Sequence, residues 1–354
     1  MLVGLRGASD NGVASRLAGL KLTERVSGAQ LNRWEGQFIG IRTREALKAL
    51  ADASAFLRPP PSDIPAVAAP NQQMEKQIYE RMVDYVKNTL PRLPNFVAQR
   101  TTTAFAITTE YELLMEQKMS QLLRPTKKQS VYRAYQRLGS AKASGLPDGE
   151  LFWMGSFAQT VTYRDGVEVA DSSAESIIKT DRLPIGLTSN GEFGAILRTL
   201  LMDAEPEKFV WDHWERGAAE PLADFRFSVR RDRSHFAVTV GANSKPDLPA
   251  YKGEILVNPS SGEVFRISVT ANVHDLESSH STSVLVEFGP EQIGGMTYIC
   301  PIRGVAMIKS FSAYADLDAE PLPVSSYTSI NDVSFTNYHI FRSDARVLPG
   351  TPDP

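Results

Sequence analysis

The chain of 354 residues is long enough for one large or two modest domains with a proper hydrophobic core. Its net charge of -3, with 42% hydrophobic and 22% charged residues, lacks the basic excess that binding to duplex nucleic acid uses. The single cysteine, Cys300, excludes an internal disulfide, and no apolar run is long enough to predict a membrane span. The first eight residues are too few for the apolar region of a signal peptide, and the stub of a trimmed one is the alternative.

Residues 1–70 predict a helical N-terminal arm that ends in a Pro-rich linker. Short helical patterns occur at 20–26 and 29–34, and a stronger one runs from 43 to 57 with apolar side chains along one side. Consecutive prolines stop that helix, and the Pro- and Ala-rich segment 59–70 is typical of an extended linker.

The clearest helix of the chain begins after Asn71, a residue type that caps helices well. Its apolar side chains recur at steps of three and four residues and form one stripe: Met74, Ile78, Met82, Tyr85, Val86 and Leu90. A strand is predicted at 95–108. An insertion at about 110–150 follows, with helical spacing at 109–123 that fits a helix or a mobile flap, and a strand at 131–138.

From residue 207 onward, polar and apolar residues alternate in short runs that Gly, Pro, Asn or Asp interrupt, which predicts antiparallel strands with one buried face. A hairpin at 157–170 precedes them, with Asp165-Gly166 as its tight turn, and a short helix at 189–201 begins with a capping box of Ser189 and Glu192. The expected strands are 209–215, 223–230, 235–241, 252–257, 263–273, 281–288, 296–311 and 329–341.

These elements predict an α+β fold, in which a large curved antiparallel sheet carries helices on its concave side and the helical arm precedes it. The arm and linker occupy 1–70, the sheet domain with its insertion occupies 71–348, and a disordered tail occupies 349–354.

No catalytic motif is evident. Cys300 lies within an expected strand, where a free cysteine is usually a small buried hydrophobe. The segment His274 to His280 has two imidazoles and two carboxylates that could hold a metal ion, but a polar hairpin loop is the simpler interpretation. The sequence therefore predicts a protein that is not an enzyme, with no catalytic residue, no metal site and no cofactor.

The aromatic segment 211–215 contains the other histidine of interest. Strand alternation places His213 and Glu215 on one face with Trp211, and Asp212 and Trp214 on the other. We interpret it as a half-buried structural strand, with a hydrolase acting through His213 or the His274/His280 loop as a distant alternative. The basic run 230–233 predicts a charged turn, and no nucleic-acid partner is expected.

The order of features resembles a large, mostly uncharacterised group of bacterial exported proteins whose sheet domain resembles the LolA/LppX/RseB lipoprotein-carrier-like half-barrel. The matching segments are Leu22-Thr23-Glu24-Arg25, Leu50-Ala51-Asp52-Ala53-Ser54-Ala55-Phe56-Leu57, Leu93-Pro94-Asn95-Phe96, Thr162-Tyr163-Arg164-Asp165-Gly166, Gly191-Glu192-Phe193-Gly194 and Ser260-Ser261-Gly262-Glu263-Val264. The resemblance implies a periplasmic or otherwise exported protein with an apolar cavity, which receives acyl chains in the carrier family. The arm and the insertion have no counterpart there, and no binding residue is carried over.

Two functions from different classes follow. The first is a non-catalytic protein that binds a lipid-like or lipoprotein ligand between sheet and helices. Its expected cavity-lining residues are Met82, Tyr85, Phe193, Phe225, Phe227 and Phe236. The second is a structural or interaction protein of the cell envelope whose arm docks on a partner protein or a second copy. The second predicts exposed apolar surface on residues 20–57, and an arm folded onto its own sheet argues against it.

Overall fold

The computed structural model describes residues 8–108, 152–169, 187, 189, 191–239, 245–274, 278–312 and 325–340. The insertion at 110–150, with the helix expected at 109–123 and the strand expected at 131–138, lies outside these residues, as does the tail. Across the described part of the chain, no helix is long and apolar enough to cross a membrane.

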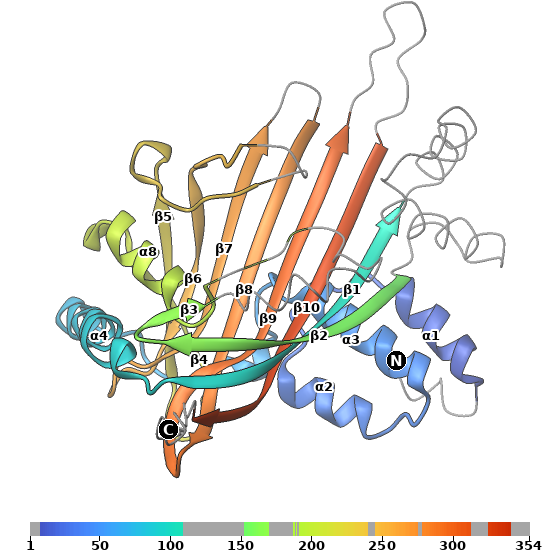
Figure 1. The fold of residues 1–354 in the computed structure, drawn as a ribbon, viewed down its shortest axis with the longest axis horizontal. Coiled ribbons are helices and arrows are strands. Elements are labelled where there is room, and N and C mark those ends of the chain that lie inside the picture. Colours follow the sequence, from blue (N-terminus) through green and yellow to red (C-terminus); the bar gives the residue numbers. More distant parts are fainter. Residues whose placement is uncertain are drawn as a thin grey trace, which may run out of the picture.

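Ten antiparallel strands form one sheet that does not close on itself, in the order β3-β2-β1-β10-β9-β8-β7-β6-β5-β4 (Figure 1). The strands are β1 (Phe96–Thr108), β2 (Phe152–Arg164), β3 (Val167–Val169), β4 (Val210–Glu215), β5 (Leu222–Val229), β6 (Tyr251–Val257), β7 (Val264–His274), β8 (Ser278–Ile293), β9 (Met296–Ser312) and β10 (Ser325–Ile340). The prediction of a large antiparallel sheet in an α+β protein is confirmed.

The expected hairpin between β2 and β3 is present. Asp165 and Gly166 both have positive φ, at 52° and 82°, as a two-residue turn between antiparallel strands requires. Neighbours in the sheet are also neighbours in the chain except at one place, where β1 pairs with β10 along almost its whole length.

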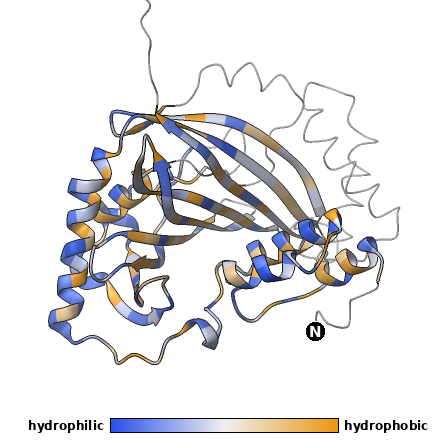
Figure 2. Ribbon diagram, turned by 90° about the horizontal axis from the view of Figure 1, so that it is seen from below, coloured by the Kyte–Doolittle hydropathy of each residue, from blue (hydrophilic) through white to orange (hydrophobic). Residues whose placement is uncertain are grey.

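The helices are α1 (Asp10–Ala18), α2 (Gly28–Glu35), α3 (Ile41–Ser54), α4 (Gln72–Asp84) and α8 (Ala195–Asp203), with a π-helical turn at Tyr85–Thr89 and 3-10 turns at Pro61–Asp63, Leu90–Arg92, Pro206–Lys208 and Arg231–Arg233. The Asn71 side chain accepts a hydrogen bond from the Met74 N–H and caps α4, as the sequence predicts. The arm formed by α1, α2 and α3 lies at the opposite end of the molecule from α4, and the linker joins them (Figures 1 and 2).

Helices pack on both faces of the sheet. One face, which we call the α8 face, presents Val284, Val286 and Ala306 to α4 and α8 in the largest core cluster. The other, the arm face, presents the alternate residues of β8 and β9, such as Leu285 and Val305, to α3. Successive side chains of β8 and β9 therefore point into two separate cores, one on each face of the sheet.

Three local expectations are wrong. The helix near the N-terminus is α1, not 20–26, because Arg25 leaves the helical path to hydrogen-bond with Arg58 through its N–H. The segment 235–241 is not a strand in its described part, where Val238 makes only an isolated bridge to Asp247. Ser189 and Glu192 form no capping box, because α8 begins after Gly194 and has no side-chain cap.

Candidate functional site

A cavity of about 320 Å³ opens on the α8 face, between α8, the segment 235–239, and strands β7 and β8. Its apolar lining consists of Leu187, Ala195, Ile196, Phe236, Ala237, Val238, Val269 and Val284, and its polar lining of Ser189, Thr199, His235, Thr239 and Thr282. This volume is at the lower end of the range of about 300–1,000 Å³ for small-molecule pockets. The cavity can hold a small amphipathic molecule or a short apolar chain.

One wall of the cavity is fixed by a buried carboxylate at the end of α8. Asp203 Oδ1 contacts His235 Nδ1 at 2.5 Å, while Oδ2 accepts hydrogen bonds from the His235 N–H and the Tyr251 hydroxyl, both at 2.8 Å. Burial and the nearby Asp203 carboxylate raise the pKa of the Tyr251 hydroxyl, which keeps it a donor. These bonds tie the segment 235–239 to α8 and β6, so the wall is preformed.

A second polar group borders the cavity where Ser189 lines it. The Arg100 guanidinium, in β1, donates to the Ser189 carbonyl at 2.8 Å and to Glu192 Oε1 at 3.1 Å, and the Ser189 hydroxyl donates to the same oxygen at 2.7 Å. Arg100 and Glu192 are both buried, and Glu192 Oε2 has no hydrogen-bond partner among the described residues. This ion pair attaches the segment before α8 to the sheet.

Five of the six residues expected to line a cavity belong to packed cores. Met82, Tyr85, Phe225 and Phe227 lie in the core between α4, α8 and the sheet, each at most 7% exposed. Phe193 is 2% exposed within a second cluster of aromatic side chains. Among the six, only Phe236 lines the cavity.

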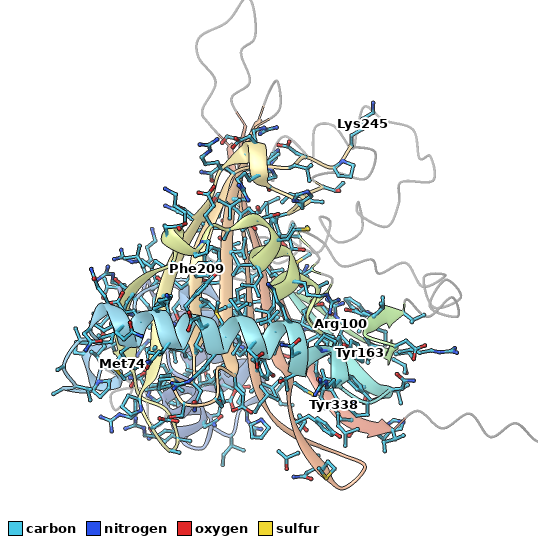
Figure 3. The ribbon with its side chains drawn as sticks, turned by 90° about the vertical axis from the view of Figure 1, so that its left-hand side faces the viewer. Met74, Arg100, Tyr163, Phe209, Lys245 and Tyr338 are labelled. Carbon is cyan, nitrogen blue, oxygen red and sulfur yellow. The ribbon has the colours of Figure 1, made fainter. Side chains whose placement is uncertain are left out.

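The aromatic cluster around Phe193 leaves no room at that position for a ligand. The ring of Phe193 lies 5.1 to 6.4 Å from four other aromatic rings, measured between centroids; these belong to Phe96, Tyr163, Phe335 and Tyr338. Figure 3 shows Tyr163 and Tyr338 beside Arg100, beyond the end of α4. Cys300 is fully buried in the same cluster, and burial raises the pKa of its thiol to about 12.

The other lining residues were not singled out from the sequence. The alternation of β7 places Val269 on an apolar face, but the same pattern holds for Ile267, which is fully buried in the core. Which apolar side chains border a void depends on where α8 and the segment 235–239 lie over the sheet, and alternation does not encode that.

The arm face differs because it buries charged side chains beside its apolar cluster. Arg303 in β9 donates to Asp52 in α3, to Glu287 in β8 and to Asp332 in β10, and Lys48 also pairs with Asp332. Burial and the like charge of Asp332 raise the pKa of Asp52 to about 8, despite the nearby Arg303.

A second charged group joins the arm to β4, β5 and β7. Glu215 accepts hydrogen bonds from Arg25 and Arg266, each through two contacts at 2.5 to 2.9 Å. Burial alone would raise the pKa of Glu215, but hydrogen bonds from His213 and Arg266 hold it well below its usual range. The arm is thus folded onto the chain's own sheet.

His213 lies in this group, and a β-bulge changes the faces expected for its neighbours. The pairing of β4 with β5 shifts between Trp211 and His213. Asp212 therefore contacts His213, while Trp211 packs with Trp214 against the core of the α8 face. The expectation that Trp211 shares a face with His213, and Asp212 with Trp214, is wrong for this reason.

Two candidates from the sequence remain, the basic run 230–233 and the loop from His274 to His280. The basic run folds as a 3-10 turn, Arg231–Arg233, with exposed ion pairs to Asp232, Asp247 and Glu205. His280 contacts the Ser310 hydroxyl at 2.8 Å. Residues 275–277 and the side chain of His274, which belong to the metal site expected as an alternative for that loop, lie outside the described residues.

Comparison with family models, with curated proteins and with solved structures gave no match, so the function of the chain is inferred from its own geometry.

Proposed function

We propose that this chain is a non-catalytic, exported binding protein that holds a small lipid-like ligand, or the short acyl part of a lipoprotein, in the cavity on the α8 face. The cavity carries this proposal, because apolar side chains and polar groups share its lining, as a molecule with both an apolar and a polar part requires. Burial of an acyl chain there stabilises the complex by roughly 0.8 kcal/mol for each methylene. In this proposal the sheet acts as a half-barrel of the lipoprotein-carrier type.

The modest volume limits the ligand. A cavity of about 320 Å³ accepts part of a lipid rather than several full chains. The preformed wall at Asp203 and His235 also favours a ligand with a polar end, because a hydroxyl or carboxylate near the His235 and Thr239 side chains keeps hydrogen bonds on entry.

The envelope-interaction alternative receives less support. Its arm would have to reach outward, yet Arg25, Lys48 and Asp52 attach the arm to the chain's own strands. Residues 20–57 leave only two large apolar side chains strongly exposed, Ile39 and Ile41, at 88% and 73%.

The test is a series of saturated fatty acids of increasing length, titrated calorimetrically into the lipid-extracted protein. We expect affinity to rise by up to roughly fourfold for each added methylene and then to level off when the cavity is full. Native mass spectrometry before extraction should show a co-purifying ligand. Absence of binding at every length, together with a clean mass for the free protein, contradicts the proposal.

A matched pair of variants assigns the binding to this cavity. Ala237→Trp places a large side chain at the rim of the cavity, where Ala237 is exposed and lines it. Ala29→Trp makes the same change on the exposed surface of α2. Ala237→Trp should weaken binding at least tenfold and Ala29→Trp should leave it unchanged; equal affinities in both place the ligand elsewhere.

A further inference from the structure

A cluster of three metal-ligating side chains lies at the junction of β4 and β5, on the arm face and apart from the cavity. Ligand atoms of Asp212, His213 and Asp224 all lie within 4.8 Å of one another. His213 and Asp224 are direct cross-strand neighbours, and the β-bulge turns Asp212 toward them. Bulges commonly redirect a side chain at functional sites.

The imidazole of His213 is oriented as in a metal centre. Nε2 lies 3.2 Å from Glu215 Oε1, and Arg25 and Arg266 hold that carboxylate in place. Metal-bound histidines usually donate their second ring N–H to a carboxylate in this way, which fixes the tautomer. The arrangement leaves Nδ1 as the nitrogen that faces Asp212, at 3.1 Å from Oδ2.

Asp212 and Asp224 each pair with an arginine through one carboxylate oxygen. Asp212 Oδ1 pairs with Arg226 at 2.6 Å, and its Oδ2 faces His213. Asp224 Oδ2 accepts from Arg266 at 3.1 Å. Asp224 is fully buried, and its Oδ1 has no hydrogen-bond partner among the described residues. A buried carboxylate oxygen without a donor is costly unless a cation or proton completes it.

We propose that this cluster is a binding site for a divalent transition metal of the zinc class, with His213 Nδ1, Asp212 Oδ2 and Asp224 Oδ1 as ligands. Zinc takes nitrogen and oxygen ligands at about 2.0–2.2 Å in a tetrahedron, so neighbouring ligand atoms lie about 3.3 Å apart. The separation of 3.1 Å between Nδ1 and Oδ2 already matches this edge. A ligand atom of Asp224 lies within 4.8 Å of the other two, so Asp224 has to move closer by up to about 1.5 Å to take the third position.

The cluster is partly accessible to solvent through two of its three side chains. The side chains of Asp212 and His213 are 12% and 16% exposed, so a small ion and one further ligand can reach the site. Three carboxylates, Asp212, Glu215 and Asp224, face three guanidiniums, Arg25, Arg226 and Arg266. A divalent ion adds positive charge to this balanced group, so we expect hydroxide or another anion as the fourth ligand. Three protein ligands leave one coordination position of a tetrahedral zinc ion for a solvent molecule or an anion.

The test uses the tag-free full chain after dialysis against a chelator. Zinc binding is measured by calorimetry, and cobalt is used as a spectroscopic substitute because its visible absorption reports tetrahedral coordination. We expect one ion per chain, with tetrahedral cobalt bands that zinc abolishes. Binding of less than one equivalent, or cobalt bands of an octahedral aqua complex only, overturns the proposal.

Substitutions of the proposed ligands test whether the ion binds at this cluster. His213→Gln and Asp212→Asn remove one ligand each at half-buried positions and should weaken binding at least 100-fold. Far-ultraviolet circular dichroism and a cooperative unfolding transition show that each variant is folded. His339→Gln is the control, because His339 is exposed and its Nδ1 contacts the Asn337 carbonyl, away from the cluster. Stoichiometric binding that survives both ligand variants, or is lost in the control, overturns the assignment. Fatty-acid binding should be unchanged throughout, so this result is independent of the cavity.

Discussion

The two faces of the sheet differ in how they combine apolar packing with buried charge: the arm face has a smaller apolar cluster and two groups of buried ion pairs. On the α8 face, the side chains of β5 to β8 that meet α4 and α8 are apolar, including Phe225, Phe227 and Val286. On the arm face, the alternate positions of the same strands include Asp224, Arg266 and Glu287. Apolar contact is not directional, so the α8 face tolerates a cavity beside a dense core. Ion pairs are directional, and their loss leaves a buried charge unpaired.

This contrast predicts where single substitutions cost most. Arg266→Met removes the guanidinium that faces both Glu215 and Asp224 and leaves two buried carboxylates short of a partner. We expect a loss of about 3–5 kcal/mol in the free energy of unfolding, measured by urea denaturation. Arg233→Met, whose exposed ion pair with Glu205 contributes about 0–1 kcal/mol, is the control. If both variants lose the same free energy of unfolding, the buried ion pairs of the arm face contribute no more to stability than an exposed pair.

The apolar face can be tested within one helix. Met82 in α4 is 1% exposed. Met74, in the first turn of the same helix, is 41% exposed (Figure 3). Met82→Ala should cost about 2–5 kcal/mol because it leaves a cavity, while Met74→Ala should change stability by less than about 0.5 kcal/mol. If Met82→Ala instead leaves stability intact and alters fatty-acid binding, Met82 belongs to the ligand site as the sequence predicted.

The seating of α4 depends on close backbone contact with the turn between β6 and β7. Gly262 has φ of 78°, and a Cβ there would lie 2.3 Å from the Arg81 carbonyl oxygen. Gly262→Ala should cost about 1–3 kcal/mol, from backbone strain and from displacement of α4. Gly295→Ala at φ of 85° meets no atom within 4 Å and should show the strain alone, about 1 kcal/mol. If both variants lose the same free energy of unfolding, α4 can move away from the added methyl group without cost.

The ion network of the arm face should respond to pH. The pKa of Asp52 is raised to about 8, so the folded protein favours the protonated carboxyl. The protonated Asp52 carboxyl contributes its full stabilisation below about pH 4, the pKa of an aspartate in the unfolded chain. This stabilisation is lost as the pH rises through about 8, the pKa in the folded protein. Between pH 5 and pH 8, at about 1.4 kcal/mol per pH unit, we expect wild type to lose roughly 4 kcal/mol relative to Asp52→Asn, measured by urea denaturation. A parallel pH dependence in the two proteins contradicts the assignment; Asp165→Asn, at an exposed turn, is the control.

Local patterns predicted the strands better than the helices of the arm. Alternation predicted strands at β5 to β10, most clearly in β5 and β7, where one face is apolar, and Asp165-Gly166 identified the hairpin turn. It failed at 235–241, where Phe236 and Val238 alternate like strand residues but lie over α8 and the cavity. Amphipathic alternation shows that a residue is buried, not that it has a strand partner.

The candidate sites were less predictable because they depend on distant partners. Arg25 meets Glu215 across 190 residues, and nothing near Arg25 indicates an ion pair. One bulged residue in β4 moved Asp212 to the side of His213, and a bulge leaves no clear mark in a sequence of this composition.

The pairing of β1 with β10 has a consequence for synthesis on the ribosome. β1 ends at Thr108, and its inner neighbour begins only at Ser325, 217 positions later. At about 5–20 residues per second, the edge of β1 that β10 will cover stays unpaired for about 10 to 40 s. β1, β2 and β3 can assemble early, and β4 to β9 can assemble in turn, but the last strand joins these two parts. A chain that stops before Ser325 should therefore expose two unpaired strand edges and be prone to aggregation or proteolysis.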